Sequence, residues 1–437
     1  MAKQRIFIGL QEIAGSAADM CRGLRELGYK CDFVTPFQNR FQYPDATNNW
    51  FIRLVRKSYE KWSQAYADRK DMARIGWKFF TKTLMLALFI SALVKYDVFI
   101  FYFNRTFSKK WWDLPILKFF RKTIVFIYVG SDSRPMYING KSLPYLEQDD
   151  LSAWLEMIAQ QKYKIKRAGL YADHIIDLPP QAYFHERKYI HFNIIGIPRE
   201  VPASKFEEPE DQSPNRALKI LHAPSHPETK GTPLIRQVIE RLKAKGHALE
   251  YIEIINQPNE AVMKSLAECD FVIDQVYADT PLAGFATEAA FFGKPSISGS
   301  YYIDGINNDF PLELMPPSLF VHPDDIEAAI EKMIVDHEFR RKMGLEARQY
   351  AESYLKPAMV ASRLMKLIDE GPPESWLRDP YELKYLHGYG VSEENVKRMV
   401  AAVIKAGGIK ALQLSDKPAL EKAFMEFAGC KTSGSED

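Results

Sequence analysis

Short apolar runs alternate with longer amphipathic stretches along most of the chain. Parallel α/β proteins show this alternation because each pair of buried strands is joined by a crossover helix. The runs in the first half are rich in β-branched and aromatic residues, which is typical of strands buried on both faces of a sheet. We predict strands there at 5–10, 31–36, 96–103, 123–130, 172–179 and 192–198.

The same alternation begins again near residue 217. We predict a second set of strands at 217–224, 248–255, 270–276 and 294–300, with helices between and after them. The stretch between the two sets contains Pro, Ser and acidic residues without periodicity, as expected of a linker. A chain of 437 residues also exceeds what one hydrophobic core usually supports, so two domains are expected.

These patterns divide the chain into five parts. They are a first domain at 1–198 with an insertion at 51–123, a linker at 199–216, a second domain at 217–354, a crossover helix at 355–371 and an appendage at 372–437. The appendage carries amphipathic helical patterns at 392–407 and 417–429, and its last residues have the composition of a disordered tail.

The composition is that of an ordinary soluble protein, with 46% hydrophobic and 26% charged residues. The four cysteines are scattered and show no zinc-binding spacing, which favours reduced thiols in a cytosol. The first residues read at once as a strand, so we expect no signal peptide. The most apolar run, 83–94, is shorter than the roughly 20 residues that span a bilayer, and we expect no transmembrane segment there.

Two loops of the second half carry candidate chemistry. The loop HAPSHPETKG (222–231) follows a buried strand and precedes a helix, where free amides and the helix dipole favour phosphate and Lys230 adds a cation. An ordinary strand–helix loop with a solvated lysine is the alternative. His222 and His226 are four residues apart without a helix to align them, so we expect no metal site.

The second loop, TPLAGFATEAAFFGKP (280–295), leads into another helix. Gly284 permits a close approach of the backbone to a ligand, and Glu288 lies in the first turns of the helix. Its carboxylate is in a position to meet ribose hydroxyls. The alternative is an acidic residue that only complements the helix dipole.

The segment from HAPSHPETKG through VIDQV to GFATEAAFFGKP resembles the donor-binding domain of GT-B glycosyltransferases, in particular the retaining family 4. The resemblance implies two Rossmann-like domains facing a cleft. It implies that Lys230 holds the donor diphosphate, that Glu288 binds the ribose, that amides near Gly284 meet phosphate or sugar, and that Asn256 lies near the base. The donor set it implies is Gly15, Ser16, His222, Ser225, Lys230, Asn256, Gly284, Phe285, Thr287 and Glu288.

The sequence departs from the family pattern at two positions. Thr280 stands eight residues before Glu288, where the family has its first motif acid, and Asp279 is one position off. Ser225 stands five residues before Lys230, where the family usually has a phosphate-binding arginine. These departures motivate a second hypothesis, in which the chain kept the fold and lost turnover.

Two segments of the first half resemble family segments on the other side of the cleft. QEIAGSA (11–17) resembles the glycine loop that faces the donor phosphates, which makes Gly15 and Ser16 candidates. YVGSDSRP (128–135) resembles a segment on the acceptor side, which makes Asp132 and Arg134 candidates. The alternative for Asp132 is the cap of a turn. With Lys230 and Glu288, Asp132 completes the catalytic residues that the resemblance implies.

Positive charge gathers in the insertion. Residues 51–123 contain 16 Lys/Arg against 5 Asp/Glu, although the whole chain has a formal net charge of only +2. Basic residues interleaved with Trp and Phe suit an anionic membrane surface, and each contributes on the order of 1 kcal/mol. Nucleic acid is a rival partner, but no nucleic-acid motif is present and we expect none. A solvated helix face over a core of aromatics is the third possibility.

Together these observations predict an enzyme that moves a sugar from a nucleotide-sugar donor to a hydroxyl acceptor. The resemblance implies retention of anomeric configuration, and the absence of an Asp-rich motif predicts that no metal is needed. We expect no cofactor. A glycan or lipid-linked acceptor at the cytoplasmic face of the membrane is the expected setting.

Overall fold

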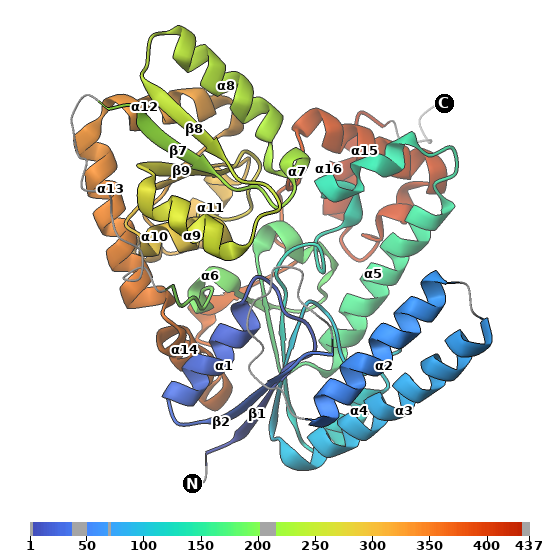
Figure 1. The fold of residues 1–437 in the computed structure, drawn as a ribbon. Helices are drawn as coiled ribbons and strands as arrows, with labels where there is room; N and C mark the ends of the chain where they lie inside the picture. The colour runs from blue at the N-terminus through green and yellow to red at the C-terminus, as the bar shows by residue number, and fades with distance from the viewer. Residues whose placement is uncertain (1–2, 37–49, 69–70, 202–215, 431–437) are drawn as a thin grey trace, which may run out of the picture.

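The computed structural model describes residues 3–36, 50–68, 71–201 and 216–430. Two parallel sheets, each flanked by helices, lie one above the other in Figure 1. The first sheet has the order β12-β6-β5-β4-β3-β1-β2. Its strands are β1 (Arg5–Gly9), β2 (Lys30–Val34), β3 (Val98–Tyr102), β4 (Thr123–Ile127), β5 (His174–Asp177), β6 (Tyr189–His191) and β12 (Leu377–Arg378).

The second sheet has the order β11-β10-β9-β7-β8 and is parallel throughout. Its strands are β7 (Leu218–His222), β8 (Leu249–Glu253), β9 (Phe271–Gln275), β10 (Ser296–Gly299) and β11 (Leu319–Val321). The expected fold class, α/β with two Rossmann-like domains, is therefore confirmed.

Helices cover both faces of the two sheets (Figure 1). In the first domain they are α1 (Ser16–Glu26), α2 (Trp50–Ala67), α3 (Asp71–Lys95), α4 (Asp113–Phe119), α5 (Ser152–Tyr171) and α6 (Phe192–Ile195). In the second they are α7 (Pro227–Lys230), α8 (Thr232–Ala244), α9 (Asn259–Glu268), α10 (Gly284–Phe291), α11 (Ile303–Asp309), α12 (Ile326–Val335) and α13 (His337–Tyr350). The chain continues into α14 (Pro357–Glu370), α15 (Glu393–Gly407) and α16 (Pro418–Phe427).

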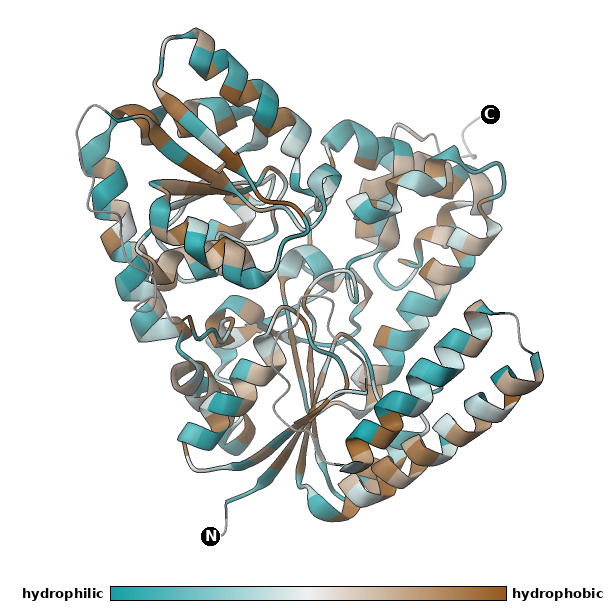
Figure 2. Ribbon diagram, in the orientation of Figure 1, coloured by the Kyte–Doolittle hydropathy of each residue, from teal (hydrophilic) through white to brown (hydrophobic). Residues whose placement is uncertain are grey.

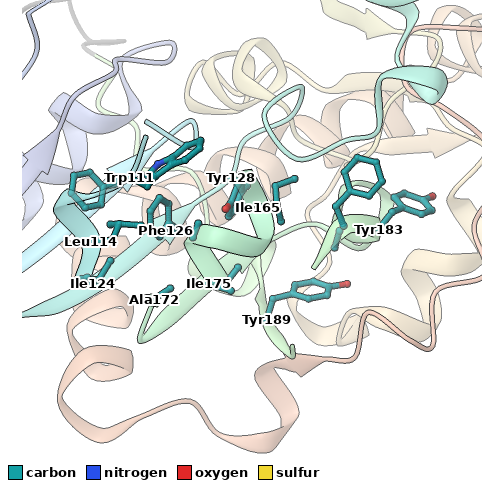
Figure 3. Packing of buried hydrophobic residues seen from close by; sticks show 14 of the residues in the cluster. Trp111, Leu114, Ile124, Phe126, Tyr128, Ile165, Ala172, Ile175, Tyr183 and Tyr189 are labelled. Carbon is teal, nitrogen blue, oxygen red and sulfur yellow. The ribbon is translucent and has the colours of Figure 1, made fainter. Parts of the chain in front are cut away.

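The first sheet is buried on both faces at its centre, because β3 and β4 are apolar at almost every position. Alternate residues point to opposite sides, so Phe99 and Phe101 of β3 pack in one core while Val98 and Ile100 pack in the other. Figure 3 shows part of the first of these cores, in which Phe126 and Trp111 pack near Leu114. The strands appear as the brown centre of the lower domain in Figure 2.

One predicted strand is wrong. Residues 192–195 form the short helix α6, residues 196–198 lie in no helix or strand, and the strand is the preceding β6. His191 ends the strand and caps the helix, because its ring nitrogen accepts from the backbone N–H of Asn193 at 3.2 Å. Gly196 follows with a φ of +87°, which leaves too few residues between the cap and the turn for a strand.

The appendage is part of the first domain rather than a separate unit. β12 pairs antiparallel with β6 and lengthens the first sheet. Val396 and Met399 of α15 and Phe424 of α16 belong to the same hydrophobic core as the first-domain strands. α14 also packs on this domain, since Val360 and Leu364 lie in its second core with α1. The predicted disordered tail lies outside the described residues, as does most of the predicted linker.

The part of the predicted insertion before residue 96 forms a helical hairpin of α2 and α3 that stands at the side of the first domain (Figure 1). The rest of 51–123 is not an insertion, because it contains β3, which pairs with β1 and β4 inside the first sheet, and α4. The apolar run 83–94 is only part of α3, which has 25 residues. α3 is long and apolar enough to cross a membrane by length and composition alone, and 28% of its most apolar window is buried in the protein. The argument that this segment is too short to span a membrane was therefore wrong, because it counted only the apolar run 83–94 and the helix α3 extends beyond that run.

Candidate functional site

The two domains meet at loops that follow parallel strands. Arg134, after β4 of the first sheet, forms a salt bridge with Asp279, after β9 of the second sheet. Thr280 donates a hydrogen bond to Asn193 of α6 across the same interface at 3.2 Å. In open α/β sheets ligands bind outside the carboxyl ends of the strands, so this interface is the place for a site.

Lys230 ends the one-turn helix α7 and is held in a network of acceptors. Gly231 follows with a φ of +73°, and a Cβ there would lie 2.5 Å from Cγ2 of Val276, so the sharp turn requires glycine. The Lys230 ammonium donates to Asp274 Oδ1 at 3.2 Å and to Gln275 Oε1 at 2.6 Å. It also donates to the hydroxyl of Tyr389.

The Lys230 side chain is only 12% exposed. Burial opposes its charge, but the Asp274 carboxylate and Tyr389 outweigh burial and raise its pKa. Lys230 is thus a buried cation at the interface between the two domains, with all three of its N–H donors engaged.

Glu288 lies in the second turn of α10 and is buried against the linker. Asn259 of α9 donates a hydrogen bond to it, and Nε of Arg199 lies 3.9 Å from its carboxylate. Burial raises the pKa of Glu288, while Arg199 opposes that rise. Gly284 is close to the same guanidinium, since a Cβ at Gly284 would lie 3.4 Å from Arg199 Nη2.

Arg199 joins this cluster to the glycine loop of the first domain. Its guanidinium donates to the carbonyl oxygen of Ala14 and lies 3.9 Å from the carboxylate of Asp19 in α1. Gly15 caps α1 with a φ of +82°. The structure therefore brings the first-domain loop at Gly15 next to Gly284 and Glu288 of the second domain.

The N-terminus of α1 is already occupied by a carboxylate. Glu12 accepts from the backbone N–H groups of Ala17 and Ala18 at 3.2 and 3.0 Å. Burial raises the pKa of Glu12 to about 7, against the effect of these two hydrogen bonds. Ser16 is buried, and its hydroxyl has no hydrogen-bond partner among the described residues.

Asp132 lies in a turn and accepts a hydrogen bond from the backbone N–H of Val129 at 3.1 Å. Burial, together with the charge of Asp177, raises its pKa to about 7. Asp132 is therefore both a turn cap, as the alternative interpretation held, and a buried carboxyl group that titrates near neutral pH.

Arg134 reaches across to the second domain. Besides its salt bridge with Asp279, its guanidinium lies 4.3 Å from the ring centroid of Tyr389. Gln181 donates to the same Asp279 carboxylate at 3.0 Å. Within the described part of the chain, the Asp279 carboxylate therefore accepts hydrogen bonds only from first-domain residues.

Other predicted donor residues lie apart from this network. His222 is fully buried, and both of its ring nitrogens have partners within the second domain, the carbonyl of Ile273 and the hydroxyl of Thr232. Ser225 and Asn256 are exposed. Thr287 is buried, and Phe285 packs partly against the second-domain core. Among the described residues no group of three or more His, Cys, Asp or Glu side chains is arranged to hold a metal ion.

Sequence reasoning missed Tyr389, Asp279 and Arg199 as parts of the interface. The Gly-Tyr-Gly sequence at 388–390 carried a signal, because an aromatic residue between two glycines marks a backbone that packs closely against its neighbours. Arg199 carried none, since it lies at the start of a segment with the composition of a linker.

No family model matches the chain, and none of the curated proteins matches its sequence. Solved structures with a similar fold include Anabaena Alr3699/HepE in complex with UDP and glucose, at 10% identity and a TM-score of 0.47 over 84% of this chain and 100% of that one. The catalytic domain of starch synthase IV from Arabidopsis thaliana, bound to ADP and acarbose, has 11% identity and a TM-score of 0.48 over 85% and 99%. SnogD from Streptomyces nogalater, a glycosyltransferase, has 13% identity and a TM-score of 0.39 over 84% and 100%. At these values the likeness assigns no residue of this chain a role.

Proposed function

We propose that the protein is a glycosyltransferase that moves a sugar from a nucleoside-diphosphate sugar to a hydroxyl acceptor. The observation that carries the proposal is the buried Lys230 ammonium, which a one-turn helix presents at the carboxyl end of the second sheet, against the first domain. A diphosphate leaving group requires a fixed cation of this kind, because negative charge develops on its bridging oxygen as the sugar departs.

Four other predicted residues have positions that suit this proposal. Glu288 and Gly284 lie on one loop and helix of the second domain, where a carboxylate can accept from ribose hydroxyls and a glycine leaves room for the donor. Asp132 and Arg134 lie on the first-domain side, where the acceptor hydroxyl would approach. Retention of configuration and independence of metal ions are part of the proposal.

The α2–α3 hairpin supports a membrane-linked acceptor. α3 exposes apolar side chains spaced three, four or seven residues apart, which places them on one face, and they are Met72, Ile75, Phe79, Leu86, Ile90 and Val94. Phe119 and Phe120 at the end of α4 are also exposed. Cations that flank exposed aromatics suit an anionic lipid surface. We propose that the protein works as a peripheral protein on the cytoplasmic face of a membrane.

A nucleotide-binding relative without turnover is the second candidate. Two observations favour it: Thr280, in place of the first motif acid, is bonded to Asn193 of the other domain, and Ser225, in place of the arginine, is exposed. In this case the protein would bind a nucleotide or glycan as a subunit of an assembly machinery.

The donor site is tested by thermal unfolding of the purified full chain with UDP, GDP, ADP and CMP and their sugar conjugates. We expect stabilisation by one nucleotide series, since a ligand at about 100 times its Kd contributes about 2.7 kcal/mol. Lys230→Ala and Glu288→Gln should abolish the shift. Lys245→Ala is the matched control, because Lys245 is an exposed lysine of the same domain that pairs only with Glu327 and Glu331.

Turnover separates the two candidates. Hydrolysis or transfer from the stabilising sugar nucleotide, lost in Lys230→Ala, would support the enzyme. Binding without turnover over a broad set of hydroxyl acceptors would support the inactive relative. The absence of a shift with every nucleotide would contradict the donor site.

A further inference from the structure

A strap from the appendage lies between the two domains. Residues 388–390 run beside the first-domain segment 138–140. The backbone N–H of Tyr389 donates to the carbonyl oxygen of Ile138 at 3.1 Å, and the backbone N–H of Gly140 donates to the carbonyl oxygen of Tyr389 at 2.9 Å. On its other side the strap meets the second domain, because the N–H of Gly390 donates to the carbonyl of Tyr277 at 3.0 Å.

Glycines bring three backbones into direct contact there. A Cβ on Gly140 would lie 2.0 Å from the carbonyl oxygen of Gly390, and a Cβ on Gly390 would lie 2.8 Å from that of Thr229. No side chain fits between these layers. The residues next to them in sequence, Lys141, Tyr389 and Lys230, are therefore brought close together from three parts of the chain.

Three cations lie near this contact between the strap and the two domains: Lys230, Arg134 and Lys141. The first two have acceptors for their N–H groups and the third has none among the described residues. Lys230 donates to Asp274, Gln275 and Tyr389, and Arg134 pairs with Asp279. Within the part of the chain that the structure describes, the Lys141 ammonium has no ion pair and no hydrogen bond. Burial and the like charges of Arg134 and Lys230 lower the pKa of Lys141.

Such an arrangement of cations favours the binding of an anion. Lys141 is exposed enough to reach solvent, yet it faces two cations without a carboxylate of its own. A group with several negative oxygens would relieve this repulsion and accept from both lysines. The nucleoside diphosphate of the proposed donor is a group of that kind.

We propose that Lys141, from the first domain, binds the donor diphosphate together with Lys230 and supplies the second phosphate-binding cation that the second domain lacks at Ser225. This inference rests on the proposed function. A phosphate oxygen takes the place of the Tyr389 hydroxyl at Lys230, so that Tyr389 competes with the donor rather than binding it. The clamp then closes only when the two domains are together, because its lysines come from different domains.

The inference is tested by calorimetric titration of the full chain with pyrophosphate and with the nucleoside, monophosphate and diphosphate of uridine, adenosine and guanosine. Lys141→Gln should weaken binding of the diphosphate and of pyrophosphate about tenfold, the effect of one lost charge-assisted hydrogen bond, and leave the nucleoside unchanged. Lys405→Gln, at an exposed lysine of α15, should change nothing. Tyr389→Phe should leave the diphosphate affinity equal or about threefold tighter, because a competitor for Lys230 is lost.

Each outcome has one meaning. Equal losses for nucleoside and diphosphate in Lys141→Gln would overturn the inference in favour of a structural role. Unchanged affinities in Lys141→Gln, with a loss in Lys230→Ala, would overturn the inference and leave the proposed function standing. Weaker diphosphate binding in Tyr389→Phe would overturn the competition between Tyr389 and phosphate. If the wild-type protein binds none of these compounds, the proposed function and the inference both fall.

Discussion

Arg134 of the first domain and Asp279 of the second form a salt bridge in which each side chain is only 3% exposed. Asp279 also accepts from Gln181, so three side chains hold the two domains together away from water. Removal of one partner from a buried pair leaves the other charge without compensation, and that costs far more than the loss of an exposed pair.

We therefore expect Asp279→Asn to destabilise the protein by about 3–5 kcal/mol in urea unfolding. Glu331→Gln, which breaks exposed ion pairs with Lys245 and His247, should cost less than about 1 kcal/mol. A cost for Asp279→Asn no larger than that of Glu331→Gln would show that the buried salt bridge does not hold the domains.

Gly390→Ala tests the close packing of the strap. Gly390 has a φ of +67°, and an added Cβ would lie 2.8 Å from the carbonyl oxygen of Thr229. Gly429→Ala is the matched control, since Gly429 has a φ of +69° and nothing within 4 Å of its added Cβ. The control should lose about 1–2 kcal/mol from backbone strain alone, and Gly390→Ala at least about 1 kcal/mol more. Equal losses in thermal unfolding would mean that the strap is not tightly packed.

Asp132 should make stability depend on pH. Burial and Asp177 raise its pKa from 3.8 to about 7 in the folded protein. Between these values the native state keeps a proton that the unfolded state has lost, so this group's contribution falls as pH rises from about 4 to 7. The full change is on the order of 4 kcal/mol. Urea unfolding of Asp132→Asn at pH 5 and pH 8 should show a smaller loss of stability with pH than the wild type, and parallel losses would contradict the assignment.

Most of the strands could be predicted because their apolar runs leave no alternative. β3 and β4 are buried at almost every position, and a run of this kind is stable only between two layers of helices. The apolar run at 192–198 was predicted as a strand, but an apolar run of this length also suits a short buried helix. The helix cap at His191 and the positive φ of Gly196 favour the helix. A local pattern does not contain that information.

The site was only half predictable for a different reason. Lys230 and Glu288 lie in helices whose positions follow from the strands before them, α7 after β7 and α10 after β9. Tyr389 and Arg199 reach the interface through long-range packing: Tyr389 arrives from an appendage more than 150 residues away in sequence from Lys230, and Arg199 from the start of the linker. The appendage lacked any resemblance to the family, so nothing in the sequence tied its residues to the cleft.

The exposed face of α3 leads to the last prediction. Phe79 is 73% exposed, and Ile90 on the same face is also exposed, although each would stabilise the fold if it were buried. We expect the protein to bind vesicles that contain anionic lipid, and the double variant Phe79→Glu/Ile90→Glu to bind at least tenfold more weakly in co-sedimentation, because two apolar contacts with the acyl boundary are replaced by repelled charges. Lys78→Gln/Lys82→Gln should weaken binding at low salt and have little effect at high salt, since the headgroup attraction is screened.

Leu345→Glu is the matched control for these variants, because Leu345 is an exposed leucine on α13 of the second domain, away from the hairpin. It should bind vesicles as the wild type does. If the α3 variants also bind as the wild type does, the lipid contact lies elsewhere on the protein. If the wild type does not bind at all, the proposed membrane contact of α3 is contradicted, and the acceptor need not be lipid-linked.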